Sequence, residues 1–306
     1  MAQLVARLLF LLAAAFARLP WPWLRRIADA LASLWIRRDA RESRVARRNL
    51  ELAYPELLPG ERTQWHRAIL RTTARQALET LRLWTRPPAR NLPLIRETSG
   101  VELFEQARAD GRGVIVAAPH YGNWELLNQW LASRTPLAIL YRPPESAIGE
   151  AFLNHVRAAF GDRVTQVRAE GPAIRQLFKL LKDGGVVGIL PDQQPKAGDG
   201  EFAPFFGVQA LTMTLLGRLA QRTGACVLFA YCERLEAGRN GEPAFALRFE
   251  AAPEDIADTD PQYAVAALNA AVERIARRDP AQYQWTYKRY TLRPPGSGER
   301  NPYPPH

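Results

Sequence analysis

The chain is poor in the residues that carry disulfide and metal chemistry. Its 306 residues include only two cysteines, Cys226 and Cys232, and four histidines. The cysteines lie six residues apart in an apolar run that predicts a strand, so they share a face about 20 Å apart. That separation is too large for a disulfide, and the histidines show no metal-ligand spacing with acids or cysteines. We therefore expect core thiols in a reducing compartment and no metal site.

The local motifs of several enzyme classes are also missing. The sequence has no Gly-x-Ser-x-Gly elbow, which argues against a serine hydrolase. It has no P-loop and no Gly-x-Gly-x-x-Gly after a predicted strand, so nucleotide binding has no support. We expect no cofactor, and the chemistry has to come from the side chains themselves.

The most informative segment covers residues 114–127. An apolar, β-branched run ends in a proline and is followed by His120 and, five residues later, Glu125. Residues five apart point about 140° apart on a helix, so these two meet only if His120 lies on a loop and Glu125 in the next helix's first turn. Asn123 is a good N-cap for that helix. The segment predicts an imidazole held through one nitrogen by Glu125, with the other nitrogen free as a base. The alternative is a strand-end histidine and an ordinary first-turn glutamate.

Positive charge is concentrated at the start of the chain. The net charge is +10, and residues 1–50 hold ten arginines against three acids. Such a block favours a polyanionic partner, which could be anionic lipid headgroups, an acidic protein or nucleic acid. A solvated basic helix is the alternative.

The same region contains an unbroken apolar run at residues 8–17, flanked by arginines. Ten residues are too few to cross a bilayer, but extension through residue 24 gives a marginal span with two interfacial tryptophans. A cleaved signal peptide is the alternative, and the positive charge after the run opposes it. We predict an uncleaved membrane anchor helix over residues 1–26, with the catalytic domain in the cytoplasm.

The remainder predicts an α/β fold with a mostly parallel sheet flanked by helices, because short β-branched runs alternate with helical patterns. The predicted strands are 114–118, 137–141, 164–167, 186–190, 225–232 and 244–250. The predicted helices are 27–35, 42–52, 61–84, 124–132, 147–160, 173–181, 211–222 and 261–278. We assign residues 27–295 to the catalytic domain and expect a disordered, proline-rich tail at 296–306.

Polar loops follow three of the predicted strands, and such loops converge on one edge of a parallel sheet. They carry His120, then Arg142, then Asp192 with Gln193. A histidine base without a covalent nucleophile suits direct transfer, in which a deprotonated hydroxyl attacks an activated carbonyl. The oxyanion needs separate donors, for which Arg142 or the backbone amides of residues 121–123 are candidates.

Two later segments have open interpretations. Phe205 belongs to an aromatic run that forms either core or a hydrocarbon-binding wall. Lys288 and Arg289 alternate with aromatic residues in a segment that resembles a final strand, where both would be exposed. In a functional interpretation they contact phosphate or a carrier.

Taken together, these segments resemble the bacterial lipid A biosynthesis late acyltransferases, the lauroyl/myristoyl acyltransferase family. Residues 120–125 match the family's H-x₄-D/E block. Later matching blocks are residues 141–143, 190–193, 204–207 with Thr212, and 282–290 closing on Arg293 and Pro294. The blocks occur in order over most of the chain.

The resemblance implies a glycerolipid-acyltransferase-like fold at the cytoplasmic face of a bacterial inner membrane. It implies transfer of a fatty acyl group from acyl carrier protein to a hydroxyl on a hydroxyacyl chain of a lipid A precursor. His120 would be the base and Glu125 its partner, Arg142 would meet phosphate or carrier, and Asp192 would support the site floor. The implied partners are acyl carrier protein, the lipid A precursor and membrane lipids, with no nucleic acid.

The implied substrate-binding residues are Asn123, Arg142, Asp192, Gln193, Phe205, Lys288 and Arg289. Two alternatives remain open at this stage. The same base could acylate a lysophospholipid, an ornithine lipid or a glycolipid. The chain could also be a non-enzymatic protein that binds membranes or nucleic acid through its basic helices, which predicts salt-sensitive binding and no acyl transfer.

Overall fold

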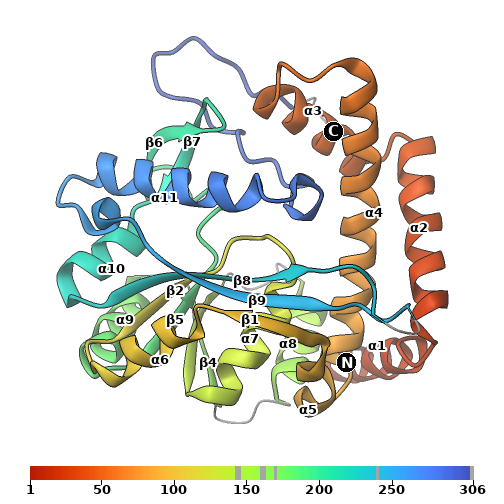
Figure 1. Cartoon of the computed structure of the whole chain (residues 1–306), viewed down its shortest axis with the longest axis horizontal. Coiled ribbons are helices and arrows are strands. Elements are labelled where there is room, and N and C mark those ends of the chain that lie inside the picture. Colours follow the sequence, from red (N-terminus) through yellow and green to blue (C-terminus); the bar gives the residue numbers. More distant parts are fainter. Residues whose placement is uncertain (142–145, 159–162, 169–170, 239–240, 304–306) are drawn as a thin grey trace.

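The computed structural model describes residues 1–141, 146–158, 163–168, 171–238 and 241–303. Its centre is a seven-stranded sheet with the order β1-β9-β8-β2-β5-β3-β4 (Figure 1). The strands are β1 Ile95–Ser99, β2 Val114–Ala117, β3 Leu137–Tyr141, β4 Val164–Arg168, β5 Val186–Ile189, β8 Cys226–Arg234 and β9 Phe245–Ala251. Neighbouring strands are parallel except β8 and β9, which confirms the mostly parallel sheet.

Helices cover both faces of this sheet, and the central strands are buried on both sides. In β2, Ile115 and Ala117 face one core cluster, whereas Val114 and Val116 face the other. The first cluster includes residues of α9 (Gly171–Lys182), α10 (Leu215–Thr223) and α11 (Pro261–Ala276). The second includes residues of α6 (Val101–Ala109) and α7 (Trp124–Arg134). Burial on both faces explains why the strand reads as a continuous apolar run.

A helical wall stands at one end of the sheet. It consists of α2 (Trp21–Arg37), α3 (Arg41–Ala53) and the long α4 (Pro59–Trp84), with α2 and α4 side by side in Figure 1. The remaining helices are α1 (Ala2–Phe16), α5 (Pro88–Asn91) and α8 (Ala147–Ala158), with short 3₁₀ segments at Leu92–Leu94, Glu254–Ala257 and Pro280–Gln282.

The N-terminal segment does not form the single anchor helix expected over residues 1–26. It forms α1 and α2, separated by residues 17–20. The break includes Pro20, which disfavours helical geometry in the residue before it. Within the described residues no one helix has the length and hydropathy of a bilayer span. The two helices meet that test only together, and they are bent by 112°.

Four local features differ from expectation. Residues 211–213 complete a hairpin of β6 (Gly200–Phe205) and β7 (Val208–Met213), so the predicted helix over 211–222 begins later, at Leu215. The strand β1 and helix α6 were not predicted. Residues 283–292 form turns rather than a final strand. The segment expected to be a disordered tail packs through Tyr303, which is 4% exposed and donates a hydrogen bond to Asn49.

Candidate active site

The loops that follow β2 and β5 meet because these strands are neighbours in the sheet, with Ala117 opposite Ile189. His120 lies on the first loop and Asp192 on the second. The Nδ1 atom of His120 lies 2.7 Å from Oδ1 of Asp192, and the backbone N–H of His120 donates to Oδ2 at 2.9 Å. Both residues are buried, at 7% and 4% exposure. The predicted convergence of these two loops is confirmed.

Asp192 is held in its ionised form despite its burial. Burial would raise its pKa, but the charge of His120 and the hydrogen bonds from its ring and backbone outweigh this effect and lower the pKa below the ordinary value. Tyr283 lines the same small pocket as this carboxylate, and its own pKa is raised by burial and by Asp192. Because an ionised carboxylate only accepts hydrogen bonds, Nδ1 of His120 carries the proton. In the uncharged form of the ring, the lone pair is therefore on Nε2.

The Nε2 atom faces an amide. Nε2 lies 3.1 Å from Nε2 of Gln193, which also donates to Gln284 at 3.4 Å. The ring of Trp124 lies edge-on to the imidazole, with 4.8 Å between ring centroids. Within the described residues, Nε2 thus has the Gln193 amide as its hydrogen-bond partner, and the Trp124 ring packs against the imidazole.

The C-terminal segment holds the histidine loop in place. Gly122 donates to the carbonyl of Gln282 at 3.1 Å, and Gln284 donates to the carbonyl of His120 at 3.0 Å. Gly122 has φ +61°, and a Cβ there would lie 2.0 Å from the carbonyl oxygen of Cys232. Only glycine fits this close approach.

All three backbone amides that were candidates for the oxyanion site are already bonded. Tyr121 donates to Pro119, Gly122 to Gln282 and Asn123 to Cys232. This excludes the turn as the source of free donors in this conformation. These amides are bonded because the loop packs between the end of β8 and the C-terminal segment, and each supplies a backbone carbonyl as acceptor.

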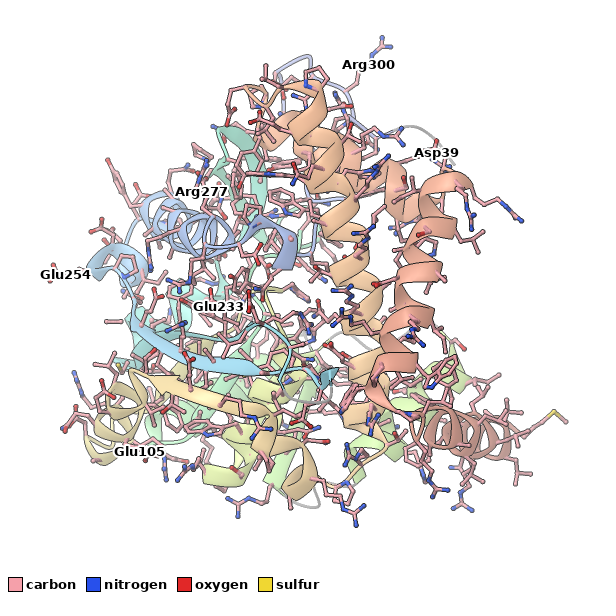
Figure 2. The ribbon with its side chains drawn as sticks, turned by 45° about the vertical axis from the view of Figure 1, so that its right-hand side comes forward. Asp39, Glu105, Glu233, Glu254, Arg277 and Arg300 are labelled. Carbon is pink, nitrogen blue, oxygen red and sulfur yellow. The ribbon has the colours of Figure 1, made fainter. Side chains whose placement is uncertain are left out.

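A charged cluster supports the loop from the sheet. Glu233, at the end of β8, accepts from the hydroxyl of Tyr121 at 2.8 Å, from Arg248 at 2.6 Å and from Arg278 at 2.8 Å. Burial would raise its pKa, but these three hydrogen bonds lower it to about 2. Figure 2 shows Glu233 near the centre of the molecule, close to the sheet. Because Tyr121 adjoins His120 in the chain, the cluster fixes the position of the base.

Asn123 and Glu125 lie where the sequence predicted. The Oδ1 atom of Asn123 accepts from the backbone N–H of Leu126 at 3.0 Å, which confirms the N-cap of α7. Its Nδ2 atom is buried without a hydrogen-bond partner in the described part of the chain. Glu125 is half-buried in the first turn of α7. The carboxylate on Nδ1 of His120, however, belongs to Asp192, so the contact expected from Glu125 is made by a residue from the neighbouring strand's loop.

The other predicted site residues are Arg142, Phe205, Arg289 and Lys288. Arg142 lies outside the described residues. Phe205 is 1% exposed and packs with Phe206 and Tyr290, as core. Arg289 is 4% exposed and donates to Leu211 at 2.6 Å and to Thr212 at 2.5 Å. The expectation that Arg289 is an exposed cation is wrong, because the segment turns instead of alternating as a strand.

Lys288 is half-buried, with its ammonium 5.9 Å from the ring centre of Tyr303.

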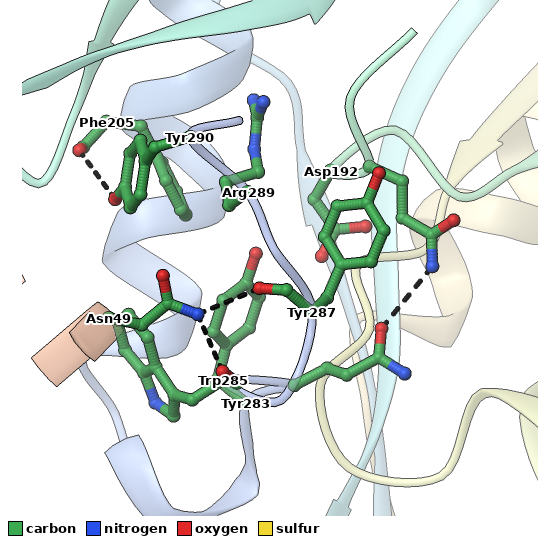
Figure 3. Close-up of a pocket in the computed structure, with 10 residues that line it drawn as sticks. Asn49, Asp192, Phe205, Tyr283, Trp285, Tyr287, Arg289 and Tyr290 are labelled. Atoms are coloured by element: carbon green, nitrogen blue, oxygen red, sulfur yellow. Dashed lines mark hydrogen bonds between the residues drawn. The ribbon is translucent and has the colours of Figure 1, made fainter. Parts of the chain in front are cut away.

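A small pocket lies beside Asp192 and is lined by Asn49, Gln193, Phe205, Tyr283, Gln284, Trp285, Tyr287, Arg289 and Tyr290 (Figure 3). Asn49, from α3, donates to the carbonyls of Trp285 and Tyr287 at 2.6 and 2.8 Å. The helical wall thus fixes the segment that closes the site. Among the described residues no cluster of His, Cys, Asp or Glu could hold a metal ion.

The sequence was compared with protein families and with known proteins. The family model described as bacterial lipid A biosynthesis acyltransferase matches residues 3–291. The chain belongs to this family. It is 28% identical over 285 residues to the lipid A biosynthesis lauroyltransferase of Escherichia coli K12, covering 92% of this chain and 90% of that protein.

Two other relatives in that organism also match most of the chain. The lipid A biosynthesis palmitoleoyltransferase is 29% identical over 289 residues, covering 92% of this chain and 89% of the relative. The lipid A biosynthesis myristoyltransferase is 25% identical over 258 residues, covering 83% and 76%. The lipid A acyltransferase family membership confirms the resemblance seen in the sequence and supports an acyltransferase activity.

The sequence prediction did not include two residues of this candidate site, Glu233 and Tyr283. Glu233 directly follows the predicted strand at 225–232, so it carries the same signal as the other polar residues at strand ends. Tyr283 lies within a block that matched the family, but nothing in the local pattern indicates that it shares a pocket with Asp192. Contacts between such distant segments depend on the order of the strands.

Proposed function

We propose that this chain transfers a fatty acyl group from acyl carrier protein to a hydroxyl on a hydroxyacyl chain of a lipid A precursor. The proposal places the enzyme at the cytoplasmic face of the bacterial inner membrane. The observation that carries the chemistry is the contact of 2.7 Å between Nδ1 of His120 and Asp192. It leaves the opposite nitrogen as a proton acceptor at the end of a parallel strand, where active sites of such sheets collect.

In the proposed mechanism Nε2 of His120 removes the proton from the acceptor hydroxyl. The hydroxyl oxygen attacks the thioester carbonyl, the C–S bond breaks, and the leaving thiolate takes the proton back from the imidazolium. Asp192 stabilises the positive charge on the ring while it exists. The acceptor hydroxyl takes the place of the Gln193 amide, 3.1 Å from Nε2. General-base assistance of this kind contributes about 10²–10⁴ in rate.

Glu125 remains in the proposal as a second carboxylate, in the first turn of α7. Because Asp192 holds Nδ1, Glu125 would act through its charge at the N-terminus of α7, by stabilising the imidazolium. Substrate contacts proposed from the family resemblance are Arg142, for phosphate or oxyanion, and Asn123, whose buried Nδ2 is a spare donor among the described residues. Lys288 is the proposed cation for carrier or acceptor phosphate.

The charge distribution supports the proposed partners. The ten arginines in residues 1–50 complement both an acidic carrier protein and an anionic membrane with a phosphorylated acceptor. Nucleic acid would also match the charge, but it gives no role to a buried histidine and carboxylate at the sheet edge. A binding protein without catalysis is therefore the weaker proposal.

The test of this proposal is the mass of lipid A in cells that lack the protein. We expect a lipid A lighter by one secondary acyl chain, restored by the wild-type chain and not by His120→Ala. An unchanged lipid A mass, with a change in a lysophospholipid, ornithine lipid or glycolipid instead, would show that the acceptor is wrong. A panel of acyl carrier protein thioesters with a tetra-acylated acceptor then gives the preferred chain length.

A further inference from the structure

The two sides of α1 have opposite relations to the rest of the molecule. Ala6 and Ala17 are at most 2% exposed on one side. On the same side the ring of Phe10 lies 4.5 Å from that of His155 and 6.3 Å from that of Phe152, both in α8. Residues 6, 10 and 17 share a face at about 100° per residue. The helix is therefore attached along its length to the body of the protein.

The opposite side of α1 is a row of leucines without cover. Leu4, Leu8, Leu11 and Leu12 are 71%, 57%, 64% and 58% exposed. In Figures 1 and 2 the helix lies at the lower right edge of the molecule, beside the lower end of α4. We call these four residues the leucine face. An apolar surface of this kind marks an interaction site, because soluble proteins rarely leave contiguous large side chains in water.

The surroundings of the leucine face are basic. Arg7 and Arg18 border it, and Arg25 and Arg26 follow at the start of α2, all four exposed. No acid precedes Asp29 in the sequence. Trp23 is 55% exposed, with the guanidinium of Arg26 5.3 Å from its ring centre. Leucines, an amphipathic tryptophan and a rim of arginines complement the acyl chains, interface and headgroups of an anionic bilayer.

The corner after α1 fixes the direction of α2. The carbonyl of Leu19 accepts from Arg82 at 2.7 Å, and the same guanidinium lies 4.0 Å from the ring centre of Trp21. Further along α2, Asp29 forms a two-fold ion pair with Arg75 of α4 at 2.7 and 2.8 Å. The helix α2 is thus part of the helical wall, and it leaves α1 at a bend of 112°.

We propose that α1 lies flat in the surface of an anionic membrane, with the leucine face among the acyl chains and α2 rising away from it. This deepens the proposed function and rests on it only for the presence of a lipid acceptor in the same membrane. The 15 residues of α1 extend about 22 Å, and in this orientation they all stay at one depth. The attachment would bring the whole domain to the lipid surface in a fixed orientation.

The first experiment measures binding of the full chain to vesicles of phosphatidylcholine with phosphatidylglycerol. Leu8→Glu with Leu11→Glu should weaken partitioning at least tenfold. The control is Leu58→Glu, since Leu58 is 65% exposed at the start of α4, at the opposite end from α1. It should change binding less than twofold. Equal effects of the two variants, or no effect of the first, would overturn the proposal.

The second experiment measures depth. A bimane label at Leu4→Cys or Leu11→Cys, in a Cys226→Ala background, reads the depth of two points seven residues apart on α1, while Cys232 is fully buried. Lipids brominated near the headgroup should quench both labels equally and more strongly than lipids brominated near the chain end. Unequal depths, or deeper quenching at one position, would indicate a helix inserted across the bilayer and refute the flat orientation.

An assay in detergent distinguishes failure of the proposed acyl transfer from failure of the proposed membrane attachment. With an acceptor dispersed in detergent, the leucine-face variant should transfer acyl groups within about threefold of wild type, because none of the described contacts of the His120 ring or the Asp192 carboxylate involves α1. Loss of vesicle binding with retained transfer supports the membrane surface. Loss of transfer in detergent would contradict the assignment of this face to membrane attachment alone, whatever the vesicles show.

Discussion

Asp192→Asn changes the proton position on the base without removing its support. The asparagine Oδ1 can still accept from the backbone N–H of His120, which lies 2.9 Å from the present Oδ2. The amide nitrogen then faces Nδ1, 2.7 Å away, and it can only donate. The ring has to accept at Nδ1 and carry its proton on Nε2. In that tautomer the nitrogen facing the substrate is no longer a base.

The expected loss of activity in Asp192→Asn follows from the loss of general-base assistance. Removing general-base assistance costs about 10²–10⁴ in rate, so we expect kcat to fall by about 10³ with KM changed only a few-fold. The assay is the initial rate of transfer from an acyl carrier protein thioester to a tetra-acylated acceptor. Gln193→Ala is the matched control, because it removes the partner of Nε2 without changing the tautomer. It should stay within about tenfold of wild type.

Asp192→Asn activity within tenfold of wild type would refute the assignment of the tautomer. So would an equal loss in Gln193→Ala, because that would show sensitivity to any change beside the ring. The folded state should survive the substitution, since one acceptor for the loop amide remains. A urea unfolding curve for each variant separates loss of chemistry from loss of fold.

Three further substitutions test the surroundings of the base. Glu125→Gln should lower kcat by about tenfold, less than removal of His120, and unchanged activity would contradict its charge-stabilising role. Gly122→Ala should lower the free energy of unfolding by at least about 2 kcal/mol because its Cβ would meet the Cys232 carbonyl, whereas Gly111→Ala, with φ +68° and open space, should cost about 1 kcal/mol in urea unfolding. Glu233→Gln should cost about 1–3 kcal/mol near neutral pH. Because the pKa of Glu233 is lowered from 4.5 to about 2, its contribution is complete above about pH 4.5 and is lost as pH falls towards 2. The stability difference from wild type should therefore shrink over that range, and a constant difference would contradict the ionised cluster.

The central strands could be predicted because burial on both faces leaves a plain signal. The runs at 114–117, 137–141 and 186–189 are continuous and apolar, and each is a strand in the structure. The edge strand β1, Ile95–Ser99, is mostly exposed and polar, so it gives no such pattern. The hairpin β6–β7 was not predicted because β7 ends at Met213, only two residues before α10 begins at Leu215, and residues 211–213 were assigned to that helix.

The base could be predicted, but its partner could not. His120 follows the continuous apolar run of β2 and precedes α7, which is capped by Asn123. Both features are visible in the local sequence. The choice between Glu125 and Asp192 depends on the adjacency of β2 and β5, and no local pattern encodes strand order. The burial of Arg289 was missed for a similar reason, since alternating aromatics indicate a strand unless tertiary contacts turn the chain.

The most direct test of the account is acyl transfer by purified His120→Ala, with an acyl carrier protein thioester as donor and a tetra-acylated lipid A precursor as acceptor. The account predicts a rate at least about 10³ below wild type, with folding and vesicle binding retained. Turnover close to that of wild type would contradict the central claim that this imidazole takes the proton from the acceptor.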